Sequence, residues 1–249
     1  MIDVFAYQPI VLGYELIPEQ MKLYRNYMAQ LFSALMKSRR FTQVRIPTEA
    51  NAEESGLPPE DYMNRMEKAY HIDYPMLNLK CEQKIKQFEK YHQFILRTGA
   101  DSELFFDLTG RTWHIDAGDG DWPCGEVYIA PNETQTRGTV FFDRLFIGDV
   151  GEFQNVTLFI EEGMVAHSSN DEVKKYMDSL PAEDKVVCEL GLGMNPNVTE
   201  LCGYTVLDEK MSDSFHIAIG ANNMFGGQNK SSRHTDFVHS GCFRLQPVK

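Results

Sequence analysis

The chain has 249 residues and carries 24 Lys and Arg against 36 Asp and Glu, which gives a formal net charge of −12 at pH 7. This excess of negative charge argues against nucleic acid or an anionic membrane surface as the main partner, because both would repel it. No stretch of the sequence approaches the roughly 18 apolar residues that cross a bilayer, so we expect a globular protein without a nucleic-acid or membrane partner.

The first 97 residues carry patterns typical of helices. Residues 18–37 form an amphipathic pattern in which apolar side chains recur at helical spacing, namely Met21, Tyr24, Met28, Leu31 and Leu35. A second helical tract opens after Pro58-Pro59 and is expected to break at Pro75, and a third covers about 77–96. We expect the apolar stripes of all three tracts to pack in the core.

From Gly99 the pattern changes to short strands separated by turns rich in Gly, Asp, Asn and Pro. We expect one helix at about 170–178 and strands at 103–108, 111–115, 125–130, 138–147, 156–160, 186–190, 203–207, 214–219 and 234–244. The predicted fold class is α+β, with a helical N-terminal layer followed by a curved, largely antiparallel sheet. Residues 1–97 then form a mostly helical region packed on the sheet, residues 98–249 a metal-binding β-rich region, and the two together one compact unit.

Acidic and histidine side chains in the second half lie beside small or strand-forming residues, a setting that suits an oxygen- and nitrogen-liganded metal site. Glu189 is the most informative, because its carboxylate lies in the apolar run 186–190 and is costly to bury without a cation or a hydrogen-bonded partner. His234 and Asp236 are two positions apart, so a strand places both on one face. The candidate ligands are Glu126, Glu189, His216, His234 and Asp236. Taken singly, each can also be an ordinary core or surface residue.

Two other patterns in the sequence are weak candidates for ligand sites. The acidic turn 116–121 lacks the residue register and the distal glutamate of a calcium-binding loop. Gly191-Leu-Gly193 lacks the third glycine and the following helix of a dinucleotide-binding loop. We therefore expect neither calcium nor a dinucleotide.

Five motifs of the second half resemble, in order and approximate spacing, the thermophilic-aminopeptidase family, which includes aminopeptidases T and S. They are Gly125-Glu-Val-Tyr-Ile-Ala-Pro131, Glu189-Leu-Gly-Leu-Gly-Met-Asn195, Leu207-Asp-Glu-Lys210 with His216-Ile-Ala-Ile-Gly220, Gly226-Gly-Gln-Asn229, and His234-Thr-Asp236. Upstream, Ile46-Pro-Thr-Glu49 and Asp107-Leu-Thr-Gly-Arg-Thr-Trp113 are also similar to that family. The resemblance covers roughly residues 45–240.

The resemblance implies a site that holds two divalent metal ions through two glutamates, a histidine, a tyrosine and a His-x-Asp pair. Matched motif by motif, the glutamates are Glu126 and Glu189, which are also the catalytic candidates, the single histidine is His216, and the pair is His234 and Asp236. The tyrosine has no counterpart, because the position seven residues after His216 is Asn223. The chain is also shorter than the family at its N-terminal domain. Carboxylate and imidazole ligands suit Zn, Co, Mn or Fe(II).

Three functions use these residues. The first is a metal-dependent aminopeptidase-like hydrolase that acts on peptides or small amides through water activated by the two ions. The second is a mononuclear Fe(II) dioxygenase in which His216, His234 and Asp236 form a facial triad, since ring-cleaving dihydroxypyridine dioxygenases resemble the same family. The third is a peptide-binding protein of peptide natural-product maturation that has no hydrolytic activity.

The remaining expectations concern location and assembly. The five cysteines are far apart and form no CxxC pair, and the N-terminus fails the signal-peptide pattern, so we expect reduced thiols in a cytoplasmic protein. A long sheet with few helices to cover it also predicts a homodimer, in which the exposed face is buried against a second copy.

Overall fold

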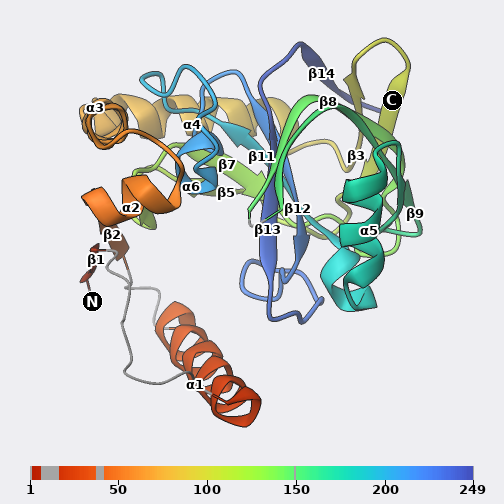
Figure 1. Cartoon of the computed structure of the whole chain (residues 1–249). Coiled ribbons are helices and arrows are strands. Elements are labelled where there is room, and N and C mark those ends of the chain that lie inside the picture. Colours follow the sequence, from red (N-terminus) through yellow and green to blue (C-terminus); the bar gives the residue numbers. More distant parts are fainter. Residues whose placement is uncertain (1, 7–16, 38–41, 149, 249) are drawn as a thin grey trace.

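The computed structural model describes residues 2–6, 17–37, 42–148 and 150–248 (Figure 1). The helices are α1 (Pro18–Lys37), α2 (Glu49–Glu54), α3 (Pro59–Tyr70), α4 (Tyr74–Phe88), α5 (Asp171–Ser179) and α6 (Thr205–Asp208), with a 3₁₀ turn at Ala182–Lys185. Within the described ranges, no helix combines the length and the apolarity needed to cross a membrane.

Most strands belong to two antiparallel sheets. The six-stranded sheet has the order β10-β9-β8-β4-β3-β14, and its strands are β10 (Met164–Ser168), β9 (Gly151–Glu161), β8 (Arg137–Ile147), β4 (Ser102–Asp107), β3 (Gln93–Thr98) and β14 (Phe243–Pro247). The five-stranded sheet has the order β13-β12-β11-β7-β5, and its strands are β13 (His234–His239), β12 (Phe215–Gly220), β11 (Val187–Gly193), β7 (Glu126–Ile129) and β5 (His114–Asp116). A small parallel sheet joins β1 (Ile2–Ala6), β2 (Thr42–Ile46) and β6 (Asp121–Trp122). The predicted α+β class with a curved, largely antiparallel sheet is confirmed, although the strands divide into separate sheets.

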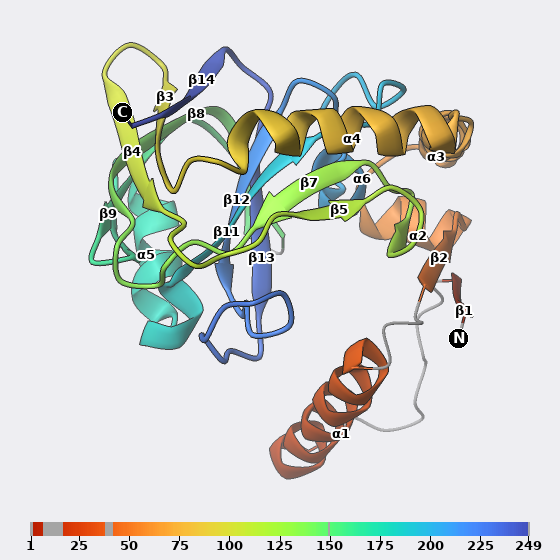
Figure 2. The same ribbon diagram turned by 180° about the vertical axis from the view of Figure 1, so that it is seen from behind.

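The main core lies between the two large sheets and beneath α4. Strand β12 alternates as the sequence predicts, so Phe215, Ile217 and Ile219 join the core while His216 lies on the opposite face. Figure 2 shows α4 running along β7 and β5, where its Leu77 and Cys81 enter the same core. The five-stranded sheet is therefore fixed from one side by apolar packing, which leaves its other face for the chemical groups.

Several local expectations are wrong, among them the single strand at 234–244, which is divided into β13 and β14. Residues 203–207 do not form a strand, because the Asp208 carboxylate accepts hydrogen bonds from the backbone N–H groups of Cys202 and Gly203 and the chain turns into α6. Pro75 does not end a helix. It lies in the first turn of α4, where its missing N–H costs nothing. The third helical tract ends at Phe88, and β3 occupies its last residues.

Helix α1 stands apart from the rest of the described structure in Figures 1 and 2. Its side chains at Leu23 and Tyr27 are 71% and 62% exposed, and Tyr24 and Leu31 of the predicted stripe are exposed as well. The expectation that this stripe packs in the core of the same chain is therefore wrong for Tyr24 and Leu31, and the side chain of Leu35 lies outside the described residues.

Candidate metal centre

The five candidate ligands lie on four adjacent strands of the five-stranded sheet, β7, β11, β12 and β13. Antiparallel register sets Glu189 and Asp236 on either side of Ala218, and sets His216 beside Gly191. These small residues leave room for the longer side chains. A Cβ atom added to Gly191 would lie 1.9 Å from His216 Nε2, so only glycine at this position lets the imidazole lie over the strand.

The first cluster, which we name the inner group, consists of Glu126, Glu189 and His216. His216 Nε2 lies 3.3 Å from Glu126 Oε2 and 3.2 Å from Glu189 Oε1. Each residue offers one ligand atom, and these three atoms all lie within 4.8 Å of one another. All three side chains are buried. Glu126 Oε2 and His216 Nδ1 have no hydrogen-bond partner in the described structure.

The second cluster, the outer group, consists of Glu189, His234 and Asp236. His234 Nε2 lies 3.4 Å from both Glu189 Oε2 and Asp236 Oδ1, and the His234 side chain is 29% exposed. His234 Nδ1 lies 2.9 Å from the carbonyl oxygen of Ala221, which only accepts hydrogen bonds. His234 Nδ1 therefore carries a proton that it donates to this carbonyl, and Nε2 faces the two carboxylates. Metal-binding histidines are typically oriented by such a bond on the nitrogen that does not bind the ion.

Glu189 belongs to both groups. Its Oε1 faces His216 in the inner group and its Oε2 faces His234 in the outer group. A carboxylate in this position has the orientation that bridges two neighbouring cations. The donor set, the unpartnered Glu126 Oε2 and the orientation of His234 thus fit two divalent ions.

The electrostatics of the cluster favour positive charge between these side chains. Burial raises the pKa of Glu189, but hydrogen bonds with His216 and His234 outweigh it and lower that pKa to about 2. Burial lowers the pKa of His216, yet the carboxylates of Glu126 and Glu189 outweigh burial and raise it. The pKa of His234 is raised in the same way, chiefly by Asp236. A position that attracts protons to both rings attracts a cation for the same reason.

Lys210 is a buried residue next to the inner group that was not among the candidates named from the sequence. Its side chain is 1% exposed, and its Nζ lies 2.5 Å from Glu126 Oε1, 2.9 Å from Glu209 Oε1 and 3.4 Å from Asp116 Oδ2. Burial raises the pKa of Asp116 to about 7. The available signal was the motif Leu207-Asp-Glu-Lys210, which contributed to the family resemblance without any role being assigned to its charged residues.

Aromatic side chains flank the cluster on the side of β5 and β7. The His114 and Tyr128 rings stack with centroids 5.3 Å apart, and Phe225 contacts both rings and also His234. Phe225 lies in the loop between β12 and β13, which Glu133 ties down through Asn222 Nδ2 and the backbone N–H of Gln228. The aromatic contacts therefore hold one wall beside the more exposed outer group.

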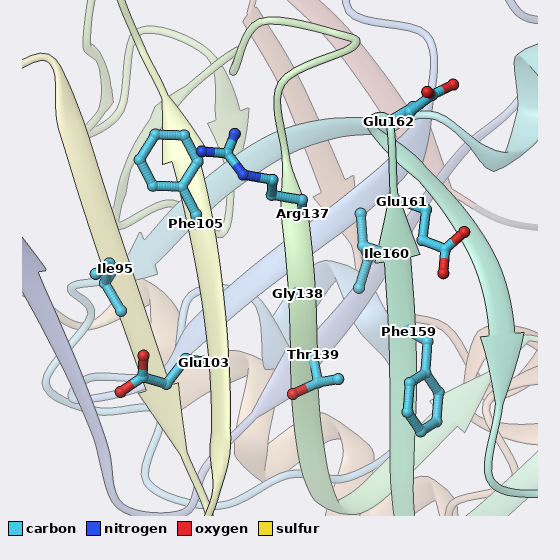
Figure 3. A pocket seen from close by; sticks show the side chains of 10 residues that line it. All are labelled: Ile95, Glu103, Phe105, Arg137, Gly138, Thr139, Phe159, Ile160, Glu161 and Glu162. Carbon is cyan, nitrogen blue, oxygen red and sulfur yellow. The ribbon is translucent and has the colours of Figure 1, made fainter.

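A separate groove of about 610 Å³ lies on the face of the six-stranded sheet that is turned away from the core (Figure 3). Its aromatic floor includes Phe105, over which the Arg137 guanidinium lies at 4.1 Å from the ring centre. None of the five candidate ligands lines it. The groove and the ligand cluster are thus distinct features, and only the cluster brings together groups with catalytic chemistry.

The sequence profile of the thermophilic metalloprotease (M29) family matches residues 14–242. The chain belongs to this family. M29 proteins are metallopeptidases that use divalent metal ions, and membership in the family supports a metal-dependent, aminopeptidase-like function. No curated protein sequence matches the chain significantly.

Two solved structures share the fold. Wild-type AmpT from Thermus thermophilus superposes with a TM-score of 0.72 at 20% sequence identity, over 99% of this chain and 72% of that one. The 2,5-dihydroxypyridine dioxygenase from Pseudomonas putida KT2440 superposes with a TM-score of 0.63 at 16% identity, over 97% of this chain and 77% of that one. At these identities the two likenesses establish the fold of this M29 member and leave its chemistry to its own residues.

The position at which the sequence comparison expected a tyrosine ligand is occupied by Asn223, and its side chain is exposed. The phenol nearest in sequence to a candidate ligand is that of Tyr128, two residues beyond Glu126 on β7 and so on the same face of the strand. Burial raises its pKa, and Glu126 and Glu189 raise it further. This M29 chain therefore has no tyrosine at the position where the resemblance implied a tyrosine ligand.

Proposed function

We propose that this protein is a metal-dependent, aminopeptidase-like hydrolase that acts on peptides or small amides, with Glu126, Glu189, His216, His234 and Asp236 as metal ligands. The observation that carries the proposal is the sharing of Glu189 by two ligand groups. Two such groups around one carboxylate hold two cations side by side, which is the arrangement of di-metal hydrolases.

The chain's own residues account for most of the proposed mechanism. Two divalent ions bound by these residues would polarise a scissile carbonyl and lower the pKa of a water molecule. Glu189 would be shared by the two ions, and Glu126 and His216 would complete the inner set. The Ala221 carbonyl holds His234 with its Nε2 toward Glu189 and Asp236.

The exposure of the outer group supports a substrate that approaches from that side. His234 is partly exposed, whereas every member of the inner group is buried. The aromatic rings of Tyr128 and Phe225 border this approach and can contact an apolar part of the substrate. A peptide with a free N-terminus presents an amine that the surrounding carboxylates attract.

The fold likeness to a dioxygenase motivates a second candidate function, but the ligand geometry supports it less. An Fe(II) facial triad would need His216, His234 and Asp236 around one ion. Among the residues that the structure describes, His216 groups with Glu126 and Glu189, and His234 with Glu189 and Asp236. A peptide-binding protein without turnover is the third candidate, and it would not need two ligand groups.

The test is a panel of short peptides with free and acetylated N-termini, incubated with metal-reconstituted protein under air and under nitrogen. We expect cleavage of the free peptides in both atmospheres, and its loss in Glu189→Gln. Turnover that requires air and Fe(II) would favour the dioxygenase instead. Saturable peptide binding with no turnover in either atmosphere would contradict hydrolysis and favour the binding protein.

Three further expectations remain predictions. The ions are Zn, Co, Mn or Fe(II), since the ligands are carboxylates and imidazoles without thiolate. A homodimer is supported by the exposed apolar side chains of α1, such as Leu23 and Tyr27. The cytoplasmic location rests on the five cysteines, which are all free thiols.

A further inference from the structure

Lys210 occupies the centre of a buried charge cluster next to the inner group. Its ammonium lies within ion-pair distance of Glu126, Glu209 and Asp116, and its side chain is 1% exposed. A buried lysine is rare unless it is paired, and this one is paired with more carboxylates than its own charge balances. Neutralising the negative charge of the cluster would not by itself require Lys210 to contact one particular oxygen of Glu126.

The contact between Lys210 and Glu126 divides the two oxygens of that carboxylate. Lys210 Nζ lies 2.5 Å from Oε1, whereas Oε2 is buried, has no hydrogen-bond partner and lies 3.3 Å from His216 Nε2. With Oε1 held, only Oε2 points into the inner group. The carboxylate is thereby presented as a single-oxygen ligand in a fixed orientation.

The backbone on both sides of this contact is fixed as well. The carbonyl oxygen of Lys210 accepts a hydrogen bond from the backbone N–H of Asn195, and the Met194 N–H donates to the Gly125 carbonyl. The Asn195 side chain donates to the carbonyl of Cys124, two residues before Glu126. A Cβ atom on Gly125 would lie 2.8 Å from that of Asn195, so Asn195 packs closely against the segment that carries Glu126 while its N–H is bonded to Lys210. The ammonium is thus held at a set distance from β7.

We propose that Lys210 is a positioning residue that orients Glu126 for the inner ion and so determines whether the centre holds two ions or one. This inference rests on the proposed function, because it requires that the inner group binds a cation. It adds to that function a residue that is not a metal ligand and belongs to neither ligand group.

When Lys210 is removed, the loss of its charge and the loss of its hydrogen bond to Glu126 predict opposite changes in metal affinity. Loss of a neighbouring positive charge makes the site more negative and would by itself tighten cation binding. Loss of the hydrogen bond frees the Glu126 carboxylate to rotate, and outer partners that orient metal ligands are typically worth 10–100-fold in metal affinity. The direction of the change in affinity therefore separates the two roles.

The experiment is a Zn²⁺ titration by calorimetry of wild type and Lys210→Met, repeated in the His234→Ala background, where only the inner group is complete, and in the His216→Ala background, where only the outer group is complete. We expect two ions per chain in wild type. Lys210→Met should weaken the inner ion by about 10–100-fold and leave the affinity of the outer ion unchanged. The control is Lys174→Met, which removes an exposed lysine from an ion pair on α5.

A double variant, Lys210→Met with Glu209→Gln, removes one charge of each sign and so keeps the net charge of the cluster. We expect it to bind the inner ion as weakly as Lys210→Met, because Glu126 Oε1 is still unheld. If Lys210→Met does not fold, as judged by circular dichroism, Lys210→Arg takes its place, and its bulkier, planar head group should also weaken the inner ion at least about tenfold.

The outcomes separate this inference from the function on which it rests. A wild type that binds two ions, with unchanged or tighter inner binding in Lys210→Met, overturns the positioning role and leaves the hydrolase proposal standing. Recovery of inner binding in the double variant also overturns it, since the inner ion would then bind tightly while Glu126 Oε1 is still unheld. A wild type that binds no ion overturns the proposed function itself and, with it, the role of Lys210.

Discussion

The two ligand groups share Glu189 and differ in their surroundings. The inner group is buried, and Lys210 contacts the oxygen of Glu126 that does not face His216. The outer group is partly exposed, and its histidine is oriented by a backbone carbonyl. If the proposed function holds, we expect the inner group to retain its ion and the outer group to present its ion to the substrate.

Substitution of the shared ligand should have the largest effect. Glu189→Gln keeps the size of the side chain but removes the charge that both groups use, so we expect both ions to be lost. Hydrolysis should fall by at least the roughly 10²–10⁴-fold that loss of a catalytic proton acceptor costs. Metal analysis of the purified variants provides the measurement, with His234→Ala as the comparison, because that variant should keep the inner ion. Equal ion content in wild type and Glu189→Gln would contradict the shared role.

A methyl group on β11 should disrupt the inner group alone. In Gly191→Ala the new Cβ would meet the His216 ring at 1.9 Å, and overpacking of this kind typically costs about 1–3 kcal/mol. We expect the ring to move, the inner ion to be lost and the melting temperature to fall. The matched control is Ala218→Gly on the paired strand, which removes a methyl group instead of adding one. An ion content of two in Gly191→Ala would show that His216 is not confined by this glycine.

The smallest expected effect compares the two histidines of β13. His234 belongs to the outer group, whereas His239 is buried against Phe142 and Phe215, and burial lowers its pKa. The unfolded chain therefore binds a proton near pH 6.5 that the native state resists, so stability is present above that pH and is lost as the pH falls below it. His239→Phe removes the titration and should lose less stability between pH 8 and pH 5.5 than wild type.

Thermal unfolding at the two pH values measures this effect, and the ion content serves as the control, because His239 lies outside both ligand groups. An identical pH dependence in wild type and His239→Phe would contradict the assignment. Loss of ions in the variant would show that the two ends of β13 are not independent.

The candidate ligands could be named from the sequence because five motifs resemble the family in order, and most of the candidates also have a local pattern. Glu189 interrupts an apolar strand, His216 occupies the opposite phase of an alternating strand, and His234 and Asp236 share a strand face. The role of Lys210 could not be found in this way, because its burial arises from contact with Glu126, 84 positions away. Which of the 24 basic residues lies beside a ligand depends on the register of strands that meet only in the folded chain.

Errors in the fold prediction have similar causes. Thr205 and Val206 have side chains that favour strands, but the hydrogen bonds of Asp208 close a turn there and α6 forms. The amphipathic pattern of α1 gave the right helix, with bounds at Pro18 and Lys37. It could not reveal that the described part of the chain leaves Leu23 and Tyr27 uncovered.

Anomalous diffraction from crystals grown with Mn²⁺ or Zn²⁺ tests most directly the claim that one glutamate joins two metal positions. The account predicts two peaks per chain about 3.5–4 Å apart, one bound by Glu126, Glu189 and His216 and the other by Glu189, His234 and Asp236. A single peak bound by both His216 and His234 would contradict it and would instead place the mononuclear iron chemistry of the second candidate function at this site.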